Sequence, residues 1–423
     1  MAKYDSFELL KKIYFVRTSG TKEELDAANI IKDECEKLGV EAHLEDFDVD
    51  GYSVKKASLS FINPDIEVEC VGVGMSSSTP EDGIIAPFVY ITSQADADYS
   101  DVEGKICLVH TKLVNTNLYK TLIKKKAVAL ILCCGSVYEK AINVDLDPYM
   151  YRERNYVNGK IPAVCIRMKD AEYILRKMPQ QAKIVMVEDE YKNKSHNVVA
   201  TIKGTKYPDE VVIFSAHYDS VSYSRGAYDN GTGSTCIMQM LDYFKKNPAK
   251  RTIKFVWCGS EEVGLLGSKA YCEKHKDELE NYKLNINVDM VGVTIGFDIA
   301  CCTTNNSLVN YIKYLSSEVG FPIMPRQGVY SSDSTPFADN GVPSLSFARL
   351  APQGGSQIHS RKDVIDYLSK PNYFKTCDFI ALFASKLANS VYFPVEKEIP
   401  ANMKEEIDYY FGRKERPNGP FMR

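Results

Sequence analysis

A series of short apolar runs, each followed by polar or acidic residues, dominates the second half of the chain. The runs are VVATI, VVIFSAH, TIKFVWCG, LNINVDMVG and PSLSFAR, between positions 198 and 349. Several are apolar at consecutive positions, as strands covered by helices on both faces require. A helix with one apolar face is expected after position 230, where Ile237, Leu241 and Phe244 recur at spacings of four and three. This alternation predicts a doubly wound α/β fold with a mixed, mostly parallel sheet flanked by helices.

A further helix is predicted near the start of the chain, over residues 21–38. Thr21 and Glu24 have the spacing of a capping box, and Gly39 follows the last helical position. One face of the helix carries Ala28, Ile31, Cys35 and Leu38. We expect this face to pack on the same sheet.

Residues 52–194 have a different texture, with short β-rich runs separated by turns such as NPD at 63–65 and SSSTPEDG at 76–83. Within them GKICLVH, a Lys-rich helix near 116–126, VALILCCG and IPAVCIRM follow one another. We therefore expect a discontinuous domain of residues 1–51 and 195–423, interrupted by a β-rich α+β insert at 52–194. The length of 423 residues suits two or three domains of roughly 100–200 residues each. The tail from about Pro394 is the most weakly patterned segment.

Composition narrows the range of partners. Charged residues make up 26% and hydrophobic residues 44%, the profile of an ordinary globular protein. The formal net charge of −4 leaves no basic field for a phosphate backbone, so no nucleic acid partner is expected. The longest apolar run, AVALILCC at 127–134, is far shorter than the roughly 20 residues that cross a bilayer. No membrane segment is expected either.

The N-terminus and the cysteines favour a cytoplasmic location. Lys3, Asp5 and Glu8 stand where a secretory signal would need an apolar run, although a chain trimmed of its leader would begin in the same way. The twelve cysteines form no C-x-x-C pair and are expected to be reduced, mostly buried thiols. The sequence leaves the oligomeric state open, with a dimer as one alternative.

Candidate chemistry gathers at the ends of the predicted strands. The chain has only six histidines; His217 ends VVIFSAH, and His359 follows the Gly-rich loop APQGGSQ. Five acids lie at strand ends or in the loops that follow, at Asp219, Asp229, Glu261, Glu262 and Asp289. Open α/β sheets place their ligand sites at these carboxyl ends. In isolation Asp229 would be interpreted as a helix N-cap, and the two glutamates as a solvated turn.

Together these side chains form a nitrogen and oxygen ligand set that suits Zn²⁺, with Co²⁺ or Mn²⁺ as alternatives. The charge balance favours two ions. Two divalent cations bring four positive charges, of which Asp229, Glu262 and Asp289 neutralise three and a bridging hydroxide the fourth. Without metal, carboxylates crowded into one cleft would repel, and the pKa of at least one would rise.

Six sequence blocks resemble the co-catalytic di-zinc exopeptidases of metallopeptidase family twenty-eight, which include aminopeptidases and glutamate carboxypeptidase. The blocks are HYD (217–219), YDNGTG (228–233), GSEEVGLLGS (259–268), NVDMVG (287–292), SDSTPF (332–337) and IHS (358–360), joined by RTSGTKEELDAANII near the start. The insert is more loosely similar to the protease-associated domain that many members carry.

The resemblance implies a zinc exopeptidase fold with two zinc ions per chain. His217 and Asp289 would hold one ion, Glu262 and His359 the other, and Asp229 would bridge both.

The resemblance also implies the roles of the remaining residues. Asp219 would orient the first histidine, and Glu261 would be the general base that takes a proton from the metal-bridging water and passes it to the leaving amine. The peptide bond after Asp229 is cis in these relatives and is expected to be cis here. Two positions depart from the family pattern. Ile358 replaces a tyrosine whose hydroxyl stabilises the oxyanion, and Ser334 replaces a histidine.

These features predict a zinc-dependent exopeptidase, an aminopeptidase, that acts on a peptide or small-molecule amide. A carboxypeptidase of the same family is an alternative, with four candidate anchors for a substrate carboxylate: Arg225, Arg326, Arg349 and Arg361. A single-zinc glutaminyl cyclase is another, although such a site does not need His217. The non-enzyme alternative is a catalytically silent binding or receptor module.

Overall fold

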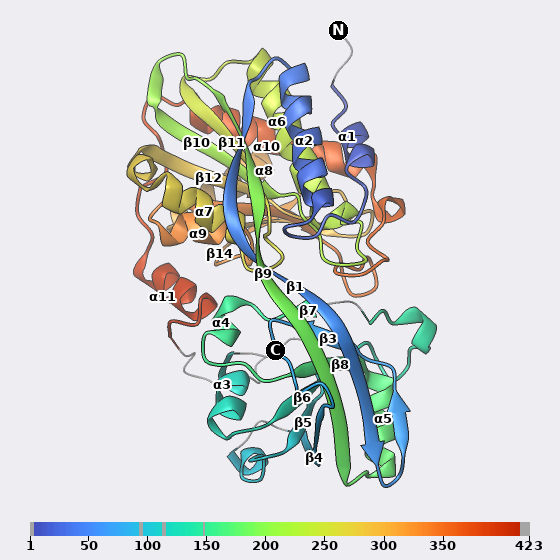
Figure 1. Cartoon of the computed structure of the whole chain (residues 1–423). Coiled ribbons are helices and arrows are strands. Elements are labelled where there is room, and N and C mark those ends of the chain that lie inside the picture. The colour runs from blue at the N-terminus through green and yellow to red at the C-terminus, as the bar shows by residue number, and fades with distance from the viewer. Residues whose placement is uncertain (1–3, 93–95, 112–115, 147–148, 415–423) are drawn as a thin grey trace. The chain divides into compact units, whose positions relative to one another are not determined.

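The computed structural model describes residues 4–92, 96–111, 116–146 and 149–414 (Figure 1). The chain divides into two compact units, one of residues 1–49 with 193–423 and one of residues 50–192. The boundaries expected from the sequence lie two residues further along the chain at each junction. Two long strands, β1 (Ala42–Ile62) and β9 (Gln181–Ile202), contribute residues to both units.

The larger unit is built on a mixed, mostly parallel sheet, which confirms the expected fold class. The strand order is β14 (Ile323–Gln327), β13 (Phe297–Thr303), β15 (Ser344–Leu350), β12 (Tyr282–Val288), β10 (Tyr207–His217), β11 (Arg251–Cys258) and the end of β9. The four central strands β15, β12, β10 and β11 run parallel to one another. β13 lies antiparallel to β15, and β9 lies antiparallel to β11.

Helices cover both faces of this sheet (Figure 1). Side chains of one face pack with α1 (Phe7–Lys12), α2 (Lys22–Lys37), α6 (Thr232–Lys246), α8 (Asn306–Val319) and α10 (Lys370–Ala388). The other face packs with α7 (Leu266–Lys274) and α9 (Ser334–Asp339). β10 shows why two layers form, because Val212 and Phe214 face the first layer while Val211 and Ile213 face the second. Short 3₁₀ helices lie at Lys276–Asn281 and Ile365–Tyr367.

α2 forms where the sequence predicts a helix, but its capping differs from the expected box. Thr21 Oγ1 accepts the N–H of Glu24 at 3.2 Å, and Gly39 takes the left-handed conformation with φ +77°. The Glu24 carboxylate does not return to Thr21. It accepts the N–H of Gly20 at 2.7 Å and the N–H of Ser260 at 2.9 Å. The first turn of α2 is therefore tied to the loop after β11.

The weakly patterned tail forms a helix, α11 (Ala401–Tyr410). Its Met403 and Ile407 are buried in a small cluster with Ala338 of α9 and Ile399. Two apolar side chains four positions apart are enough to dock a short helix, although they give little periodic signal in the sequence.

The smaller unit has its own sheet, in the order β9, β4 (Ile84–Ile91), β5 (Ile106–Val109), β6 (Ala129–Cys134), β8 (Ala163–Arg167), β3 (Val71–Gly74) and β7 (Tyr149–Met150). β2 (Ile66–Val68) pairs with β1. α3 (Thr116–Lys124) packs on one face and α5 (Met168–Lys177) on the other, each with its own apolar cluster. A short helix, α4 (Glu153–Tyr156), and 3₁₀ helices at Asp96–Tyr99 and Ala141–Asn143 complete the described part of this unit.

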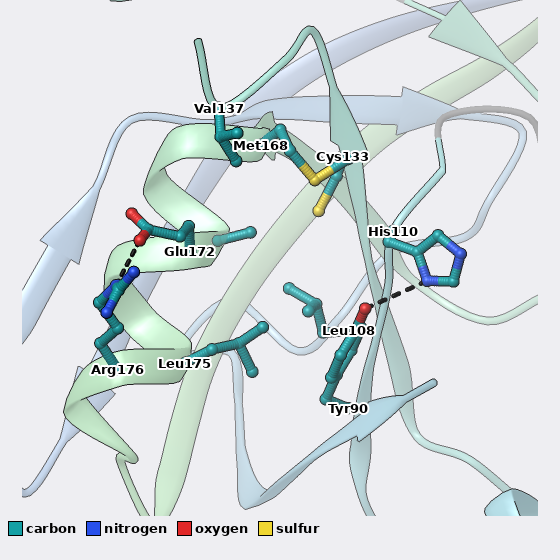
Figure 2. A pocket seen from close by; sticks show the side chains of 10 residues that line it. Tyr90, Leu108, His110, Cys133, Val137, Met168, Glu172, Leu175 and Arg176 are labelled. Atoms are coloured by element: carbon teal, nitrogen blue, oxygen red, sulfur yellow. Dashed lines mark hydrogen bonds and ion pairs between the residues drawn. The ribbon is translucent and has the colours of Figure 1, made fainter. Parts of the chain in front are cut away.

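A groove of about 340 Å³ lies beside α5 in the smaller unit (Figure 2). Its lining is mostly apolar and includes Leu108, Met168 and Leu175. Tyr90 Oη lies 3.3 Å from Nδ1 of His110 at its edge. The groove belongs to this unit alone and shares no residue with the acidic clusters described below.

The cysteines and the helices can be compared with what was expected from the sequence. All twelve cysteines are free thiols, and all but Cys70 and Cys134 are buried. Among the described residues, no helix is long and apolar enough to cross a membrane.

Candidate metal centre

Neighbouring parallel strands bring the acids and histidines of the sequence motifs to one edge of the larger unit's sheet. Because β10, β11, β12 and β15 run parallel, their carboxyl ends meet at the same edge. The strand ends and the loops and turns that follow them carry His217, Asp219, Asp229, Glu261, Glu262, Asp289 and His359. All but His359 are largely buried; half of the His359 side chain is exposed.

The ligating atoms fall into two groups that share Asp229. His217, Asp229 and Asp289 form the first group, and Asp229, Glu262 and His359 the second, with the ligand atoms of each group within 4.8 Å of one another. Asp229 Oδ1 lies 3.2 Å from His217 Nε2, and Asp229 Oδ2 lies 3.1 Å from His359 Nε2. The two oxygens of one carboxylate thus serve two different groups.

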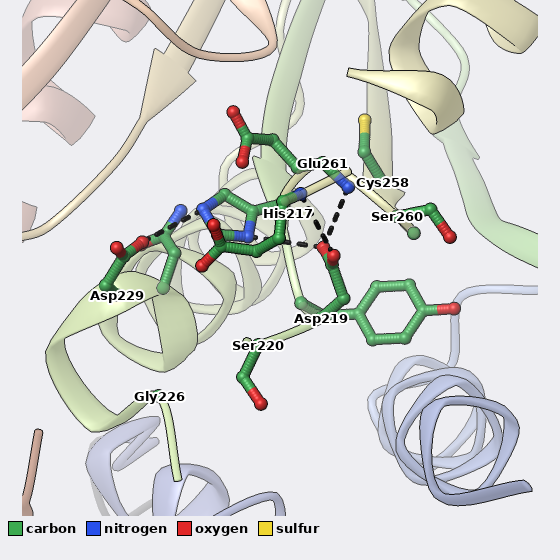
Figure 3. A network of polar contacts seen from close by, with 12 residues as sticks. His217, Asp219, Ser220, Gly226, Asp229, Cys258, Ser260 and Glu261 are labelled. Carbon is green, nitrogen blue, oxygen red and sulfur yellow. Dashed lines mark hydrogen bonds and ion pairs between the residues drawn. The ribbon is translucent and has the colours of Figure 1, made fainter. Parts of the chain in front are cut away.

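Asp219 connects the first histidine to the glutamate loop (Figure 3). Its Oδ1 lies 3.3 Å from Nδ1 of His217 and accepts the backbone N–H of Glu261 at 3.0 Å. Its Oδ2 accepts the N–H of Glu262 at 3.1 Å. A single buried carboxylate therefore fixes both the imidazole ring and the backbone of the two glutamates.

The electrostatics of the cluster favour a cation. Burial, together with the charge of Asp229, raises the pKa of Glu262. Burial also raises the pKa of Glu261, against the opposing charge of His217 and with the support of its acidic neighbours. Although burial lowers the pKa of His359, the carboxylates of Glu262 and Asp229 outweigh it and raise that pKa to about 11. The cluster holds five acids, and its two imidazoles can supply at most two positive charges. A bound cation would balance the excess of acids.

The geometry fits the ligand set of tetrahedral zinc. Ligands about 2.0–2.2 Å from a tetrahedral zinc ion lie roughly 3.3–3.6 Å from one another. The separations between imidazole nitrogen and carboxylate oxygen are similar here: His217 Nε2 lies 3.2 Å from Asp229 Oδ1 and 3.6 Å from Asp289 Oδ1, and His359 Nε2 lies 3.0 Å from Glu262 Oε2 and 3.1 Å from Asp229 Oδ2. That Asp289 oxygen is buried and accepts no hydrogen bond from the described residues. A buried acceptor of this kind needs a cation or donor beside it.

The backbone around Asp229 is held from several sides. Asp363 accepts the N–H of Tyr228 at 2.7 Å and the N–H of Asp229 at 3.0 Å. The Asp229–Asn230 peptide bond is cis, which confirms the expectation. Asn230 donates to the carbonyl of Val288 at 2.9 Å and so ties this turn to the end of β12. Sequence reasoning missed Asp363, whose only signal is its place four residues after a candidate ligand.

Asp333 is a second acid that sequence reasoning passed over, although its block was recognised. Both of its oxygens are buried and have no hydrogen-bond partner among the described residues. Burial raises its pKa to about 7, against the opposing charge of His217. Beside it, Ser334 forms a hydrogen bond with Ser346 at 2.7 Å where relatives were expected to have a histidine.

The four candidate carboxylate anchors lie in different surroundings. Arg349 donates to Asp298 at 2.5 Å and to the carbonyl of Val293 at 2.8 Å, so its guanidinium is engaged within the fold. Arg225, Arg326 and Arg361 are exposed. Arg225 lies over the ring of Tyr14 at 5.1 Å.

Comparison with known proteins finds a matching peptidase family and similar peptidases. A family model described as "Peptidase family M28" matches residues 197–384. The chain is 28% identical over 420 residues to aminopeptidase YwaD of Bacillus subtilis (strain 168), covering 96% of this chain and 87% of that protein. It is 30% identical over 303 residues to carboxypeptidase Q of Homo sapiens, covering 68% of this chain and 64% of that protein.

Solved structures show the same fold. A zinc aminopeptidase from Bacillus subtilis, BSAP, aligns with a TM-score of 0.75 at 23% identity, over 93% of this chain and 98% of that one. An aminopeptidase from Aneurinibacillus sp. strain AM-1 aligns with a TM-score of 0.74 at 22% identity, over 93% and 96%.

Proposed function

Because the chain belongs to peptidase family M28, we propose that it is a zinc-dependent exopeptidase, and more narrowly an aminopeptidase that removes N-terminal residues from peptides or small-molecule amides. The observation that carries the proposal is the pair of ligand groups that share Asp229, with Glu261 buried beside them. The match to an aminopeptidase over nearly the whole chain supports the narrower assignment.

Five side chains would hold two zinc ions. His217 and Asp289 would bind one ion, Glu262 and His359 the other, and Asp229 both. Zinc bound there supplies a Lewis acid that polarises the scissile carbonyl and lowers the pKa of water. The carboxylates of Asp229, Glu262 and Asp289 would neutralise three of the four positive charges that two zinc ions bring.

Glu261 is the general base of the proposed reaction. It is adjacent to a ligand but projects elsewhere, since consecutive side chains diverge, and it is buried near His217 (Figure 3). It would take a proton from the attacking water and pass it to the leaving amine. The hydrogen bond from its backbone N–H to Asp219 fixes the point from which it projects.

One of the four candidate anchors for a substrate carboxylate is already engaged within the fold. A carboxypeptidase needs a cation for the substrate's terminal carboxylate, and Arg349 is committed to Asp298. Arg225, Arg326 and Arg361 stay as candidates for that role, and the similarity to carboxypeptidase Q keeps the alternative in the experiment.

The test combines zinc stoichiometry with blocked peptides. Elemental analysis of the purified protein should give more than one zinc per chain at saturation, and Asp229→Ala should lose most zinc because it removes a ligand from both ions. Peptides with free N-termini should be cleaved, including those with amidated C-termini, whereas N-acetylated peptides should resist. Cleavage of acetylated but not amidated peptides would establish a carboxypeptidase. Full peptidase activity with saturation at one zinc per chain would contradict the two-zinc assignment.

A further inference from the structure

We propose that Arg17, which lies outside the matched family segment, is a positioning residue that holds the loop between Asp219 and Asp229 in shape for the metal centre. The inference rests on the proposed function, since it concerns how that centre is kept in place. Arg17 belongs to the loop before α2 and is fully buried.

The guanidinium of Arg17 binds both ends of the loop of residues 218–226. Its Nε donates to the carbonyl of Tyr218 at one end. At the other end Nη1 donates to the carbonyl of Arg225 at 2.6 Å and Nη2 to the carbonyl of Gly226 at 2.8 Å. Asp219 follows the first contact directly, and the turn with Asp229 follows the second. The guanidinium therefore sets the separation of the two loop ends.

The backbone of Arg17 reinforces the first contact. Its N–H donates to Ser220 Oγ at 3.1 Å, and its carbonyl accepts the N–H of Ser220 at 3.2 Å. Nη1 also donates to the carbonyls of Ile13 and Phe15, each at 3.0 Å, which holds the side chain in place on its own segment.

The second contact reaches the turn that carries Asp229. The carbonyl of Gly226 accepts both Arg17 Nη2 and the N–H of Gly231 at 2.9 Å. Gly226 has a left-handed φ of +52°, and a Cβ at this position would lie 2.9 Å from Nη2. The guanidinium thus occupies the space that the missing side chain leaves. A movement of the Arg17 side chain would therefore displace Gly226 and the turn that carries Asp229.

Arg17 also supplies a fixed positive charge behind the acids. Within the described part of the chain, every side-chain hydrogen bond of Arg17 goes to a backbone carbonyl. Burial lowers its pKa to about 10, against the attraction of Asp219 and Asp363, so it remains charged at neutral pH. Asp219 and Asp363 are buried acids near the centre that are not proposed ligands, and their negative charges attract the guanidinium of Arg17.

The geometry requires arginine. The planar guanidinium offers five N–H donors in a fixed fork, whereas a lysine ammonium offers three around a point. Arg17→Lys keeps the charge but cannot reach both ends of the loop at once. It therefore separates the loss of positioning from the loss of charge.

The test compares Arg17→Lys with Arg251→Lys. Arg251 is equally buried and donates to Glu210 at 2.6 Å and to the carbonyl of Ser390 at 2.6 Å, but it begins β11, at the end of the sheet away from the site. Zinc affinity is measured by competition with a chromogenic chelator, and kcat and KM with an unblocked aminoacyl chromogenic amide. Tm is measured for both variants.

Arg17→Lys should weaken zinc affinity and lower kcat by roughly 10- to 100-fold each, the range for residues that orient metal ligands. KM should change far less, because the substrate does not touch Arg17. Arg251→Lys should lower Tm while zinc affinity and kcat stay at the wild-type values. The proposal is overturned if Arg17→Lys keeps wild-type zinc affinity, or if Arg251→Lys loses as much.

Ser220→Ala provides a second variant if Arg17→Lys does not fold. It removes the acceptor of the Arg17 N–H and should weaken zinc affinity in the same direction, whereas unchanged affinity would contradict the proposal. The wild-type protein separates the two levels of inference. A wild type that neither binds zinc nor cleaves peptides contradicts the proposed function, while an active wild type beside an unaffected Arg17→Lys contradicts only the positioning role.

Discussion

Glu261 and Glu262 are adjacent and chemically alike, yet the site gives them different surroundings. Glu262 Oε2 lies 3.0 Å from Nε2 of His359, within the second ligand group. Glu261 is buried near His217 and belongs to neither group. Their amide variants should therefore fail in different ways.

Glu261→Gln keeps the shape of the side chain but cannot accept a proton. Its zinc content should persist while kcat falls by roughly 10²- to 10⁴-fold, the usual scale for a general base. Glu262→Gln should instead weaken zinc binding, and excess zinc should restore part of its activity. Zinc content and kcat measured on both variants decide between the roles. Loss of zinc from Glu261→Gln with retention in Glu262→Gln would show that the two assignments are reversed.

Single residues could be predicted where chemistry and position coincide in the sequence. His217 and Asp289 directly end or follow apolar strands, so the fold class alone indicates that they lie at one edge. Arg17 and Asp363 could not be predicted in this way, although Arg17 is the first residue of the stretch RTSGTKEELDAANII that resembles the family. Their partners are backbone atoms of distant segments, and a backbone carbonyl or N–H leaves no trace in residue identity.

At the scale of elements, the start of α2 has two separate roles: it is capped by Thr21, and it contacts the loop after β11 through Glu24. Thr21 caps the helix, while Glu24 accepts the N–H and Oγ–H of Ser260 at 2.9 and 3.0 Å. Ser260 directly precedes Glu261 and has a left-handed φ of +56°. A change at Glu24 should therefore affect Glu261, the proposed general base, whereas a change at Thr21 should not.

Thr21→Ala should cost about 0.5–2 kcal/mol of stability, the range for a lost N-cap, with kcat unchanged. Glu24→Ala should cost about 1–3 kcal/mol, because it leaves buried donors without an acceptor, and should also lower kcat. Denaturant unfolding and steady-state kinetics on the two variants test the distinction. Equal kcat values in both would mean that the Ser260 contact is not needed for catalysis.

A pH-dependent contact joins β1 to the end of α7. His275 Nε2 lies 3.1 Å from both oxygens of Glu45, which is buried. The hydrogen bond to Glu45 raises the pKa of His275, and His275 outweighs burial to lower the pKa of Glu45 to about 2. The Glu45 contribution is thus present above its ordinary pKa of about 4.3 and lost as pH falls toward 2. The His275 contribution is full below about pH 6.5 and lost as pH rises through its raised pKa.

His275→Gln should therefore flatten the dependence of unfolding free energy on pH at both ends. Denaturant unfolding of wild type and variant from acid to alkaline pH measures this. His110→Gln, an exposed histidine of the smaller unit, is the control and should keep the wild-type profile. A variant curve parallel to that of wild type would show that the pair contributes no pH dependence.

Some strands, or their direction in the sheet, were not predicted from the sequence, and the reasons can be identified. β13 and β14 escaped prediction because FDIACCT and IMPRQ are short and carry Asp298 and Arg326 inside the strand. VVATI was expected in a parallel series, but it is the end of the 22-residue β9 and pairs antiparallel with β11. Strand direction depends on the path of the chain before the strand, which local periodicity does not record.

At the scale of the molecule, all proposed zinc ligands belong to the unit of residues 1–49 and 193–423. Zinc should therefore stabilise that unit alone. Free zinc at about 100 times its Kd adds roughly 2.7 kcal/mol to the stability of the species that binds it. Calorimetry should show one transition that zinc raises and a chelator lowers, and another that neither changes.

Asp229→Ala should abolish the shift, which separates site binding from a general salt effect. If zinc raises both transitions equally in the wild type, the two units do not unfold separately. The likeness of the insert expected at residues 52–194 to a protease-associated domain stays a prediction, since the matched family segment begins at position 197.

The carboxylate of Asp229 has one further consequence, for how the centre fills. Because one oxygen faces each ligand group, the occupancies of the two proposed zinc ions would be thermodynamically linked and would not follow two independent isotherms. The first ion would fix the rotation of the carboxylate, which helps the second, and it would also withdraw negative charge, which opposes it. By reciprocity, whatever the first ion does to the affinity for the second, the second does equally to the first. A chelator that removes the more weakly bound ion would therefore also change the affinity of the site for the ion that remains.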